Sequence, residues 1–408
     1  MLTAQFVAVF LLFLGQSDII LPMKRKYSAQ FVSTYAKAKS LSPSAFEKHY
    51  LKAVKDPSTI HFQLRIDAYS CFYHQDSCQN LLVNDLMAKN AELNALLSSL
   101  TPLEMSWSQE ENLIKEVSAS LAIDRIPYSD KEVFEAIHIF HGGTGEAGAL
   151  SSSYLLIQDG FRFPLNELED LRHIYDFLMR ISLNKIERPD TSLFRMKPIP
   201  PGDERLSYIE EASSIKYALK EALSIPLLEN LNVFVKLALF DFFFAYAHPF
   251  AEGNAKLLRY LDSYFIYQNI SPYFAFCLSQ CEKESLTSLI KGYRSTLNPR
   301  NRSDLTTFCN AFLDVLSHEY DEQIYALRRQ KQHSLDLRKK YEGAIGEPLL
   351  SHLIASAVYL PCGASAYDLA SLGEVSTRTV LRALAEEKKK GFIAENPVGK
   401  TIHYILKD

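Results

Sequence analysis

The sequence predicts a mainly α-helical protein built from two or three domains. Only 15 of its 408 residues are glycine, apolar residues recur over long stretches at helical spacing, and period-two alternation is scarce. The chain is too long for one ordinary compact unit. Apolar residues make up 47% of it, charged residues 23%, and the net charge is -4, which excludes a largely disordered chain and a bulk polyanion binder.

The first 22 residues stand apart from the rest. Phe6 to Leu14 is an apolar run of signal-peptide length, but no Lys or Arg precedes it. Met23 is followed by three basic residues, so translation starting there is an equally simple explanation. We expect residues 1–22 to be a leader or an upstream extension, and the protein to be cytoplasmic.

Residues 23–117 are expected to form an N-terminal helical region. Leucines recur in its second half at spacings that place them on one helix face. These are Leu81, Leu82, Leu86, Leu93, Leu96 and Leu97. We expect this region to pack on the domain that follows it.

An apolar segment from Leu231 to Ala247 predicts a buried helix. Its apolar residues go all the way round a helical wheel, which is typical of the centre of an α domain. It contains Lys236 and Asp241 and is too short for a comfortable membrane span. At 1.5 Å per residue such a helix is about 26 Å long, the width of a small domain.

The twelve residues from His248 to Arg259 are the most informative of the chain. Pro249 disfavours helical geometry at His248, so the long helix should end there. A new helix should begin near Gly253 or Asn254, because Asn is a good cap and an apolar stripe resumes after it. The imidazole is therefore expected at a loop that leads into a helix N-terminus.

Such a loop is suited to phosphate chemistry. The first N–H groups of a helix and the positive end of its dipole attract anions. Lys256 and Arg259 add positive charge, and Glu252 is a carboxylate suited to hold a Mg²⁺ ion that bridges phosphate oxygens. His248 is the group that can accept a hydroxyl proton near neutral pH.

This stretch resembles the signature of the Fic family, His-x-Phe-x-Asp/Glu-Gly-Asn-Gly-Arg-x-x-Arg. The resemblance extends over about residues 100 to 315 and implies a Fic-type helical core, assigned to residues 118–317, with a short β-hairpin flap. It implies a protein adenylyltransferase that uses ATP and Mg²⁺ to modify a Ser, Thr or Tyr hydroxyl of a target protein. It also implies the site residues: a catalytic base, His248; a metal ligand, Glu252; and nucleotide-binding residues Gly253, Asn254, Ala255, Lys256 and Arg259.

Two of these positions depart from the signature. Ala255 stands where the family has glycine, and its methyl group could crowd a phosphate unless the backbone there is ordinary helix. Lys256 stands where the family has its first arginine, and a lysine offers one point charge in place of a planar fork. The efficiency of the enzyme is therefore left open.

The resemblance also implies a self-restraining helix. Many Fic proteins carry Ser/Thr-x-x-x-Glu-Gly/Asn, whose glutamate pairs with the second signature arginine. Ser120 and Asp124 have the right spacing, and Arg125 replaces the small residue. We expect Asp124 to pair with Arg259, with an ordinary solvated helix as the alternative.

A segment upstream of the signature resembles the flap of Fic proteins, which orders the target peptide by strand-like pairing. It runs from Phe194 to Ile199 and includes Arg195. Arg195 and Ile199 are the residues assigned to the flap.

The C-terminal part predicts a helical connector and a separate module. Residues 318–345 are highly charged and helical, which indicates a solvated connector. Residues 346–408 predict three helices and a strand–turn–strand, the pattern of a winged helix-turn-helix. Its third helix would present these residues to a DNA groove: Thr377, Arg378, Thr379 and Arg382.

The balance of basic and acidic residues leaves the role of this C-terminal module open. From Gly346 onward seven Lys or Arg face seven Asp or Glu, whereas strong DNA binding depends on phosphate neutralisation. DNA reading and protein docking are both retained. Two alternatives to an active adenylyltransferase follow: a catalytically impaired nucleotide-sensing or DNA-binding regulator, and a Fic enzyme with another phosphate-containing substrate.

The six cysteines have no paired metal-ligand spacing. They are Cys71, Cys78, Cys277, Cys281, Cys309 and Cys362. Buried reduced thiols are expected. The sequence fixes neither the target protein nor the oligomeric state.

Overall fold

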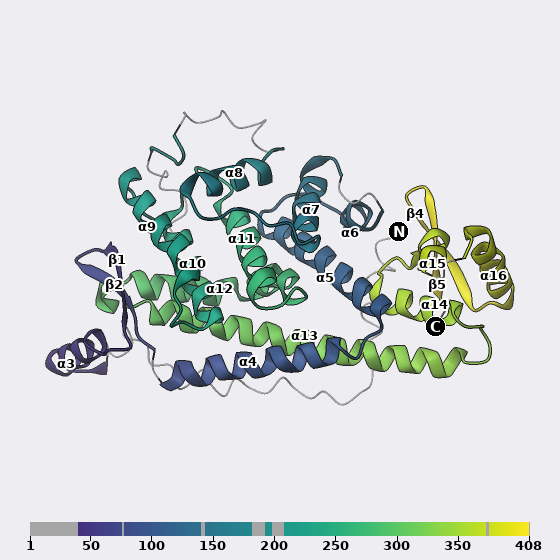
Figure 1. The fold of residues 1–408 in the computed structure, drawn as a ribbon, viewed down its shortest axis with the longest axis horizontal. Helices are drawn as coiled ribbons and strands as arrows, with labels where there is room; N and C mark the ends of the chain where they lie inside the picture. The colour runs from purple at the N-terminus through teal and green to yellow at the C-terminus, as the bar shows by residue number, and fades with distance from the viewer. Residues whose placement is uncertain are drawn as a thin grey trace.

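The computed structural model describes residues 40–75, 77–139, 143–181, 192–197, 208–372 and 375–407. The leader assigned to residues 1–22 lies outside these ranges. The fold is mainly helical, as the sequence predicts, with two small antiparallel sheets (Figure 1). Within the described ranges, every helix is too short or too polar to cross a membrane.

The first half of the chain contains α3 (Pro43–Val54), β1 (Ile60–Ile66), β2 (Tyr69–Tyr73), α4 (Ser77–Leu97), α5 (Pro102–Ile123), α6 (Asp130–Phe134), the π-helical turn η1 (Glu135–Ile139), α7 (Gly145–Gln158), α8 (Leu168–Leu178) and α9 (Ala212–Ser224). The second half contains η3 (Ile225–Leu227), α10 (Val233–Ala247), α11 (Asn254–Asn269), η4 (Phe274–Phe276), α12 (Leu278–Leu297), η5 (Pro299–Asn301) and α13 (Thr306–Tyr341). The C-terminal elements are α14 (Leu349–Tyr359), β3 (Ala364–Ser365), α15 (Ala366–Leu372), α16 (Thr377–Lys390), β4 (Ile393–Val398) and β5 (Thr401–Leu406).

Helix α10 lies at the centre of the fold. The Asn232 side chain caps it by accepting a hydrogen bond from the Phe234 N–H. Phenylalanines on several faces of α10 are buried, because α9, α11 and α13 all pack against it. The all-round apolar pattern therefore reflects burial inside the domain, as the sequence predicts. This packing fixes the end of α10, where the signature loop begins.

Helix α13 corrects the expected connector. It is 36 residues long and continues from the helical core across the predicted boundary at residue 318. It runs alongside α4 in Figure 1 and contacts it along much of its length. The leucines of α4 explain why: Leu82, Leu86, Leu93 and Leu97 are buried, whereas Leu81 is exposed. The charged face of α13 is solvated, but its other face belongs to the core.

The N-terminal region contains a β-hairpin that the sequence analysis missed. Residues 60–73 were expected to be helical, but β1 and β2 pair as an antiparallel hairpin. The sequence Ile-His-Phe-Gln-Leu-Arg-Ile of β1 alternates strictly, and Phe62, Leu64 and Ile66 are buried. Asp67 adopts φ 55° at the turn, which Asp tolerates better than most residues. The alternation was the available signal.

The C-terminal elements agree closely with the sequence prediction. Helices α14, α15 and α16 are the three helices that the sequence predicts in residues 346–408, and Ser376 caps α16. Strands β4 and β5 form the expected hairpin, and β3 adds a third strand in the order β3-β5-β4. In Figure 1 this segment forms one end of the molecule, against α5 and α6. Its assignment as a winged helix-turn-helix stays a prediction.

Candidate active site

The signature loop begins at a sharp turn at His248. Helix α10 ends there, and His248 has φ 42° and ψ 63°, the left-handed region, while its N–H still donates to the Phe244 carbonyl at 3.0 Å. The following Pro249 excludes a further helical turn. A left-handed conformation of a non-glycine residue costs about 1 kcal/mol or more, and such strain is often found at functional sites.

Arg195 holds the loop in this conformation. Its Nε donates to the His248 carbonyl at 2.7 Å, its backbone N–H donates to the Pro249 carbonyl at 2.9 Å, and a terminal nitrogen donates to the Ile209 carbonyl. Arg195 is 7% exposed. Arg195, which the resemblance assigns to the flap, thus binds the backbone of the signature loop. Ile199 lies outside the described residues, so the flap itself stays a prediction.

The His248 imidazole is set up as a neutral base. It lies against the Tyr208 ring, with 3.9 Å between ring centroids. Burial, and to a lesser extent the charge of Arg195, lowers the pKa of His248 to about 4. At neutral pH the ring is therefore unprotonated and able to accept a proton.

The loop leads directly into α11, as predicted, but the cap differs. Gly253 is the N-cap residue, with φ 76°, and a Cβ there would meet the Met179 side chain at 2.6 Å. Asn254 is the first helical residue, and its amide accepts from the Phe250 N–H and donates to the Phe250 carbonyl at 2.9 and 2.7 Å. Asn254 therefore holds the loop through the Phe250 backbone. The first N–H groups of α11 have no hydrogen-bond partner within the helix and point back towards the loop.

Glu252 is exposed at the tip of the loop. Its backbone carbonyl accepts a hydrogen bond from the Tyr175 hydroxyl at 3.1 Å. The Tyr175 ring stacks on Phe250 at 3.7 Å between centroids and 7° between planes. The backbone at Glu252 is thus anchored while its carboxylate is accessible to a cation.

Ala255 lies in the first turn of α11 and is exposed. Regular helix accepts alanine better than glycine. The departure from the signature at this position therefore causes no backbone strain.

Lys256 and Arg259, the two cationic residues of the signature loop, both contact acidic residues. Arg259 is 2% exposed, and a terminal nitrogen donates to Asp124 Oδ1 at 2.7 Å. Its Nε donates to Ser120 Oγ at 3.1 Å. Lys256 is also buried, with Nζ 3.7 Å from Glu146 Oε2 and 3.9 Å from Asp124 Oδ2. The structure thus brings Ser120, Asp124 and Arg259 together, in the pairing expected from their spacing.

The end of α5 explains the usual small residue after the acidic position. Asp124 is the C-cap of α5, and Arg125 follows in the left-handed region with φ 56°. The Ile126 N–H donates back to the Leu121 carbonyl at 3.0 Å. This is a Schellman motif, in which glycine or asparagine is preferred at the position of Arg125.

A buried polar cluster behind Arg259 was missed by the sequence analysis. Glu116 is 0% exposed, accepts from the Ser279 N–H at 2.8 Å and from the Tyr154 hydroxyl at 3.2 Å. Burial raises the pKa of Glu116. Glu146, on α7, was missed as well. Neither residue follows a recognisable motif, because only packing brings α5, α7 and α12 together around Arg259.

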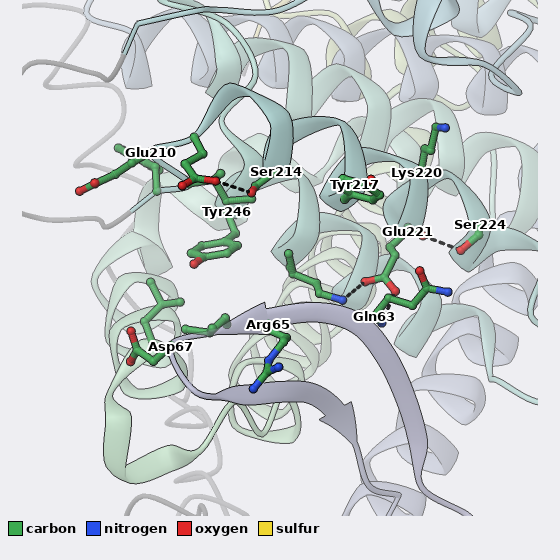
Figure 2. A pocket seen from close by; sticks show the side chains of 16 residues that line it. Gln63, Arg65, Asp67, Glu210, Ser214, Tyr217, Lys220, Glu221, Ser224 and Tyr246 are labelled. Atoms are coloured by element: carbon green, nitrogen blue, oxygen red, sulfur yellow. Dashed lines mark hydrogen bonds between the residues drawn. The ribbon is translucent and has the colours of Figure 1, made fainter.

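A separate pocket of about 970 Å³ lies between β1 and α9 (Figure 2). Tyr208 and Tyr246 line it on the side of the signature loop, and none of the twelve signature residues is among its lining residues. Glu221 crosses it to the edge of β1, where its carboxylate accepts from the Leu64 N–H at 2.9 Å and from the Gln63 N–H. This pocket is therefore distinct from the signature loop.

Residues 164–266 match the model of the Fic/DOC family. The chain carries a Fic/DOC domain. The matched range contains α8, α9, α10, most of α11 and the whole signature loop. None of the curated proteins compared with the chain matches it.

Several solved structures match the chain at low sequence identity. A Fic family protein from Desulfovibrio desulfuricans is 18% identical, with a TM-score of 0.48 over 80% of this chain and 96% of that one. A Fic domain-containing signaling protein from Bacteroides thetaiotaomicron is 13% identical, with a TM-score of 0.44 over 60% and 96%. Fic-1 from C. elegans is 11% identical, with a TM-score of 0.42 over 71% and 79%.

Proposed function

We propose that this chain is a protein adenylyltransferase that transfers AMP from ATP to a Ser, Thr or Tyr hydroxyl of a target protein. One observation carries the proposal: the His248 imidazole, whose pKa is lowered by burial, lies at a strained turn in the loop that leads into the N-terminus of α11. A base and an anion-binding helix end are thereby held a few residues apart.

The residues of the loop fit a nucleotide phosphate and its magnesium ion. Gly253 adopts the left-handed conformation that glycine favours at the entry to α11, and the first-turn amides of α11 have no partner within the helix. The exposed Glu252 carboxylate is an oxygen ligand of the kind Mg²⁺ prefers. When bound, the ion neutralises charge on the phosphate oxygens. Asn254 contributes by fixing the loop.

The chemistry assigned to the chain is a single displacement. The target hydroxyl oxygen attacks the α-phosphorus of ATP, the bond from that phosphorus to the bridging oxygen breaks, and pyrophosphate leaves. His248 accepts the hydroxyl proton. Arg195 keeps the imidazole in place through the His248 carbonyl, and so acts as a positioning residue.

We further propose that the structure is a restrained state. Asp124 holds Arg259, and Asp124 and Glu146 flank Lys256. These are the two cations that the outer phosphates of ATP would otherwise engage. Binding of ATP in a productive manner then requires that the acidic side chains give up these contacts.

DNA binding by the C-terminal module is the second candidate function. Thr377, Arg378, Thr379 and Arg382 are all exposed on the N-terminal half of α16. This favours a surface that can reach a groove, although the balanced charge of the module limits its attraction to phosphates. A salt-sensitive shift of duplex DNA, lost in Arg378→Ala, would support this role.

The proposed activity is tested by transfer of label from α-labelled ATP with Mg²⁺ to protein, with a cell lysate as the source of targets. Label should appear with the wild-type chain and disappear with His248→Ala. His173→Ala is the matched control, because His173 is exposed on α8. Equal labelling by wild type and His248→Ala would refute the assignment. Label from other nucleotides alone would favour a Fic enzyme with another substrate.

A further inference from the structure

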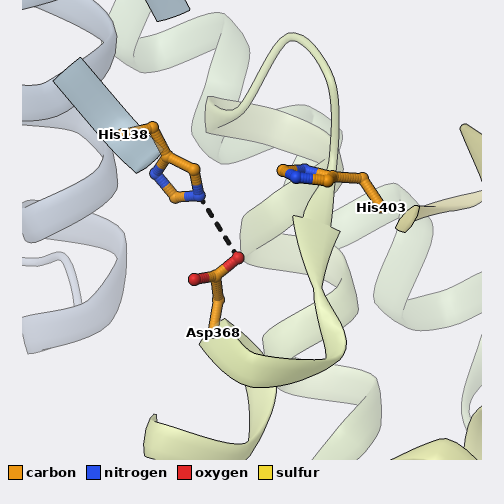
Figure 3. Close-up of side chains that lie close together, drawn as sticks. All are labelled: His138, Asp368 and His403. Atoms are coloured by element: carbon orange, nitrogen blue, oxygen red, sulfur yellow. Dashed lines mark hydrogen bonds and ion pairs between the residues drawn. The ribbon is translucent and has the colours of Figure 1, made fainter. Parts of the chain in front are cut away.

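A cluster of two histidines and an aspartate lies where the C-terminal segment meets the helical core. His138 comes from η1, Asp368 from α15 and His403 from β5, and one potential ligand atom of each lies within 4.8 Å of the others. Figure 3 shows the two imidazoles on either side of the Asp368 carboxylate. Segments more than 200 residues apart in sequence thus converge on one point.

Each imidazole is held through its Nδ1 atom. His403 Nδ1 lies 2.9 Å from the Gly363 carbonyl, which can only accept, so Nδ1 carries the proton and Nε2 has the lone pair. His138 Nδ1 lies against the Glu110 carboxylate, and its Nε2 lies 3.2 Å from Asp368 Oδ2. A metal-binding histidine commonly has this arrangement, with the second nitrogen donating to a carboxylate or a carbonyl.

Asp368 is held in place as well. Its carboxylate accepts from the Ser365 N–H at 2.7 Å and from the Ser365 hydroxyl at 2.6 Å. The three side chains are well enclosed: His403 is 1% exposed, and the side chains of His138 and Asp368 are 7% and 22% exposed. Two carboxylates, Glu110 and Asp368, face two imidazoles, so with both rings neutral the cluster carries a charge of -2. One divalent cation would neutralise it.

A proton competes with a metal ion for the imidazole of His138. Burial lowers the pKa of His138, but the hydrogen bonds that it donates to Asp368 and Glu110 outweigh this effect and raise the pKa to about 10. Without a cation, the ring is an imidazolium between two carboxylates. That proton would bind only His138 and its two acceptors, whereas a metal ion would also engage His403.

We propose that His138 Nε2, His403 Nε2 and the Asp368 carboxylate bind one zinc-type divalent transition-metal ion that ties the C-terminal module to the helical core. Two imidazoles and one carboxylate suit zinc and its neighbours, whereas Mg²⁺ and Ca²⁺ prefer oxygen ligands alone. Zn–N and Zn–O bonds of about 2.0–2.1 Å give tetrahedral ligand separations of about 3.3 Å. The 3.2 Å between His138 Nε2 and Asp368 Oδ2 already has that length. Small side-chain rotations close the remaining separations, and water completes the tetrahedron.

The test uses the full chain without an affinity tag, stripped with a chelator and titrated with Co²⁺ and then Zn²⁺. We expect one equivalent of Co²⁺ to bind with intense visible ligand-field absorption, and Zn²⁺ to displace it. His403→Ala and Asp368→Asn should weaken zinc binding at least 100-fold. Glu110→Gln, which removes only the outer partner of His138, should weaken it about 10- to 100-fold. His173→Ala, an exposed histidine on α8, should leave it unchanged.

Two results would overturn the proposal. One is a tag-free wild-type chain that binds no zinc at micromolar concentration, and the other is binding that survives His403→Ala. If a ligand variant unfolds, X-ray absorption of the zinc-loaded wild-type chain decides instead. Nitrogen and oxygen ligands that include two imidazoles would support the site, whereas sulfur ligands would place the zinc at cysteines and contradict the assignment.

Discussion

Replacing Asp124 by Asn should make the protein less stable and its nucleotide site more accessible. The substitution keeps the shape of the side chain but removes the charge that Arg259 meets at 2.7 Å. Removing one partner of a fully buried ion pair costs about 3–5 kcal/mol, and an exposed pair contributes about 0–1 kcal/mol. Arg259 is 2% exposed and Asp124 is 19% exposed, and Ser120 still accepts from Arg259. We therefore expect a loss of about 1–2 kcal/mol in the free energy of unfolding.

In the proposed restrained state, the same contact would compete with the outer phosphates of ATP for Arg259. Its loss should therefore strengthen ATP binding, and raise AMP transfer at limiting ATP, by about 5- to 30-fold, since 1.36 kcal/mol corresponds to a factor of ten. Calorimetric titration with ATP and Mg²⁺, denaturant unfolding and labelled-AMP transfer measure the three quantities. The matched control is Asp159→Asn, the same substitution at the exposed C-cap of α7.

The reasoning requires that the free energy of unfolding falls while the affinity for ATP rises. A variant that is less stable and also binds ATP more weakly would show that Asp124 supports the site instead of restraining it. Unchanged values for both would mean that the contact with Arg259 contributes nothing. In Arg259→Ala the Asp124 substitution should have a much smaller effect on ATP binding, because only the longer contact of Asp124 with Lys256, at 3.9 Å, is left.

Three further predictions concern the backbone and the base. Arg125→Gly should raise the free energy of unfolding by about 1 kcal/mol, because residue 125 has a left-handed conformation after α5; denaturant unfolding measures it, and a loss of stability would contradict the capping argument. Ala255→Gly should lower stability by about 0.5–1 kcal/mol without raising AMP transfer, since this position is exposed in regular helix; a large gain in transfer would show that the methyl group crowds a phosphate. The pKa of His248 in the folded protein is lowered to about 4. Between about pH 6.5 and 4 the unfolded chain therefore binds a proton at His248 more readily than the folded chain, and the free energy of unfolding falls as the pH drops. The His248→Gln variant should lack that part of the pH dependence. Transfer should accordingly show no loss attributable to His248 protonation above about pH 5, and a kinetic pKa near 6.5 assigned to His248 would contradict it.

Most of the elements around the signature loop follow from local sequence signals. Pro249 ends α10, Gly253 permits the left-handed entry into α11, and the apolar stripe of α11 resumes at once. The helices and hairpin of the C-terminal segment were equally predictable, because capping residues, turn residues and periodicity act over a few residues. The partner of Arg259 was expected from the family resemblance, applied to the spacing of Ser120 and Asp124. Family resemblance supplied the proposed chemistry.

Only the tertiary structure decided which distant side chains meet. Arg195 is separated from His248 by a segment of more than 50 residues, yet it donates a hydrogen bond to the His248 carbonyl. Glu146 reaches Lys256 because α7 packs beside α11. His138 and His403 converge because the C-terminal segment lies against α5 and η1. Such contacts depend on how helices pack through their buried faces, and many sequences with the same local signals could pack differently. Local sequence therefore determined the elements and the signature, while packing determined the contact of Asp124 with Arg259, the contact of Arg195 with the His248 carbonyl, and the histidine–aspartate cluster.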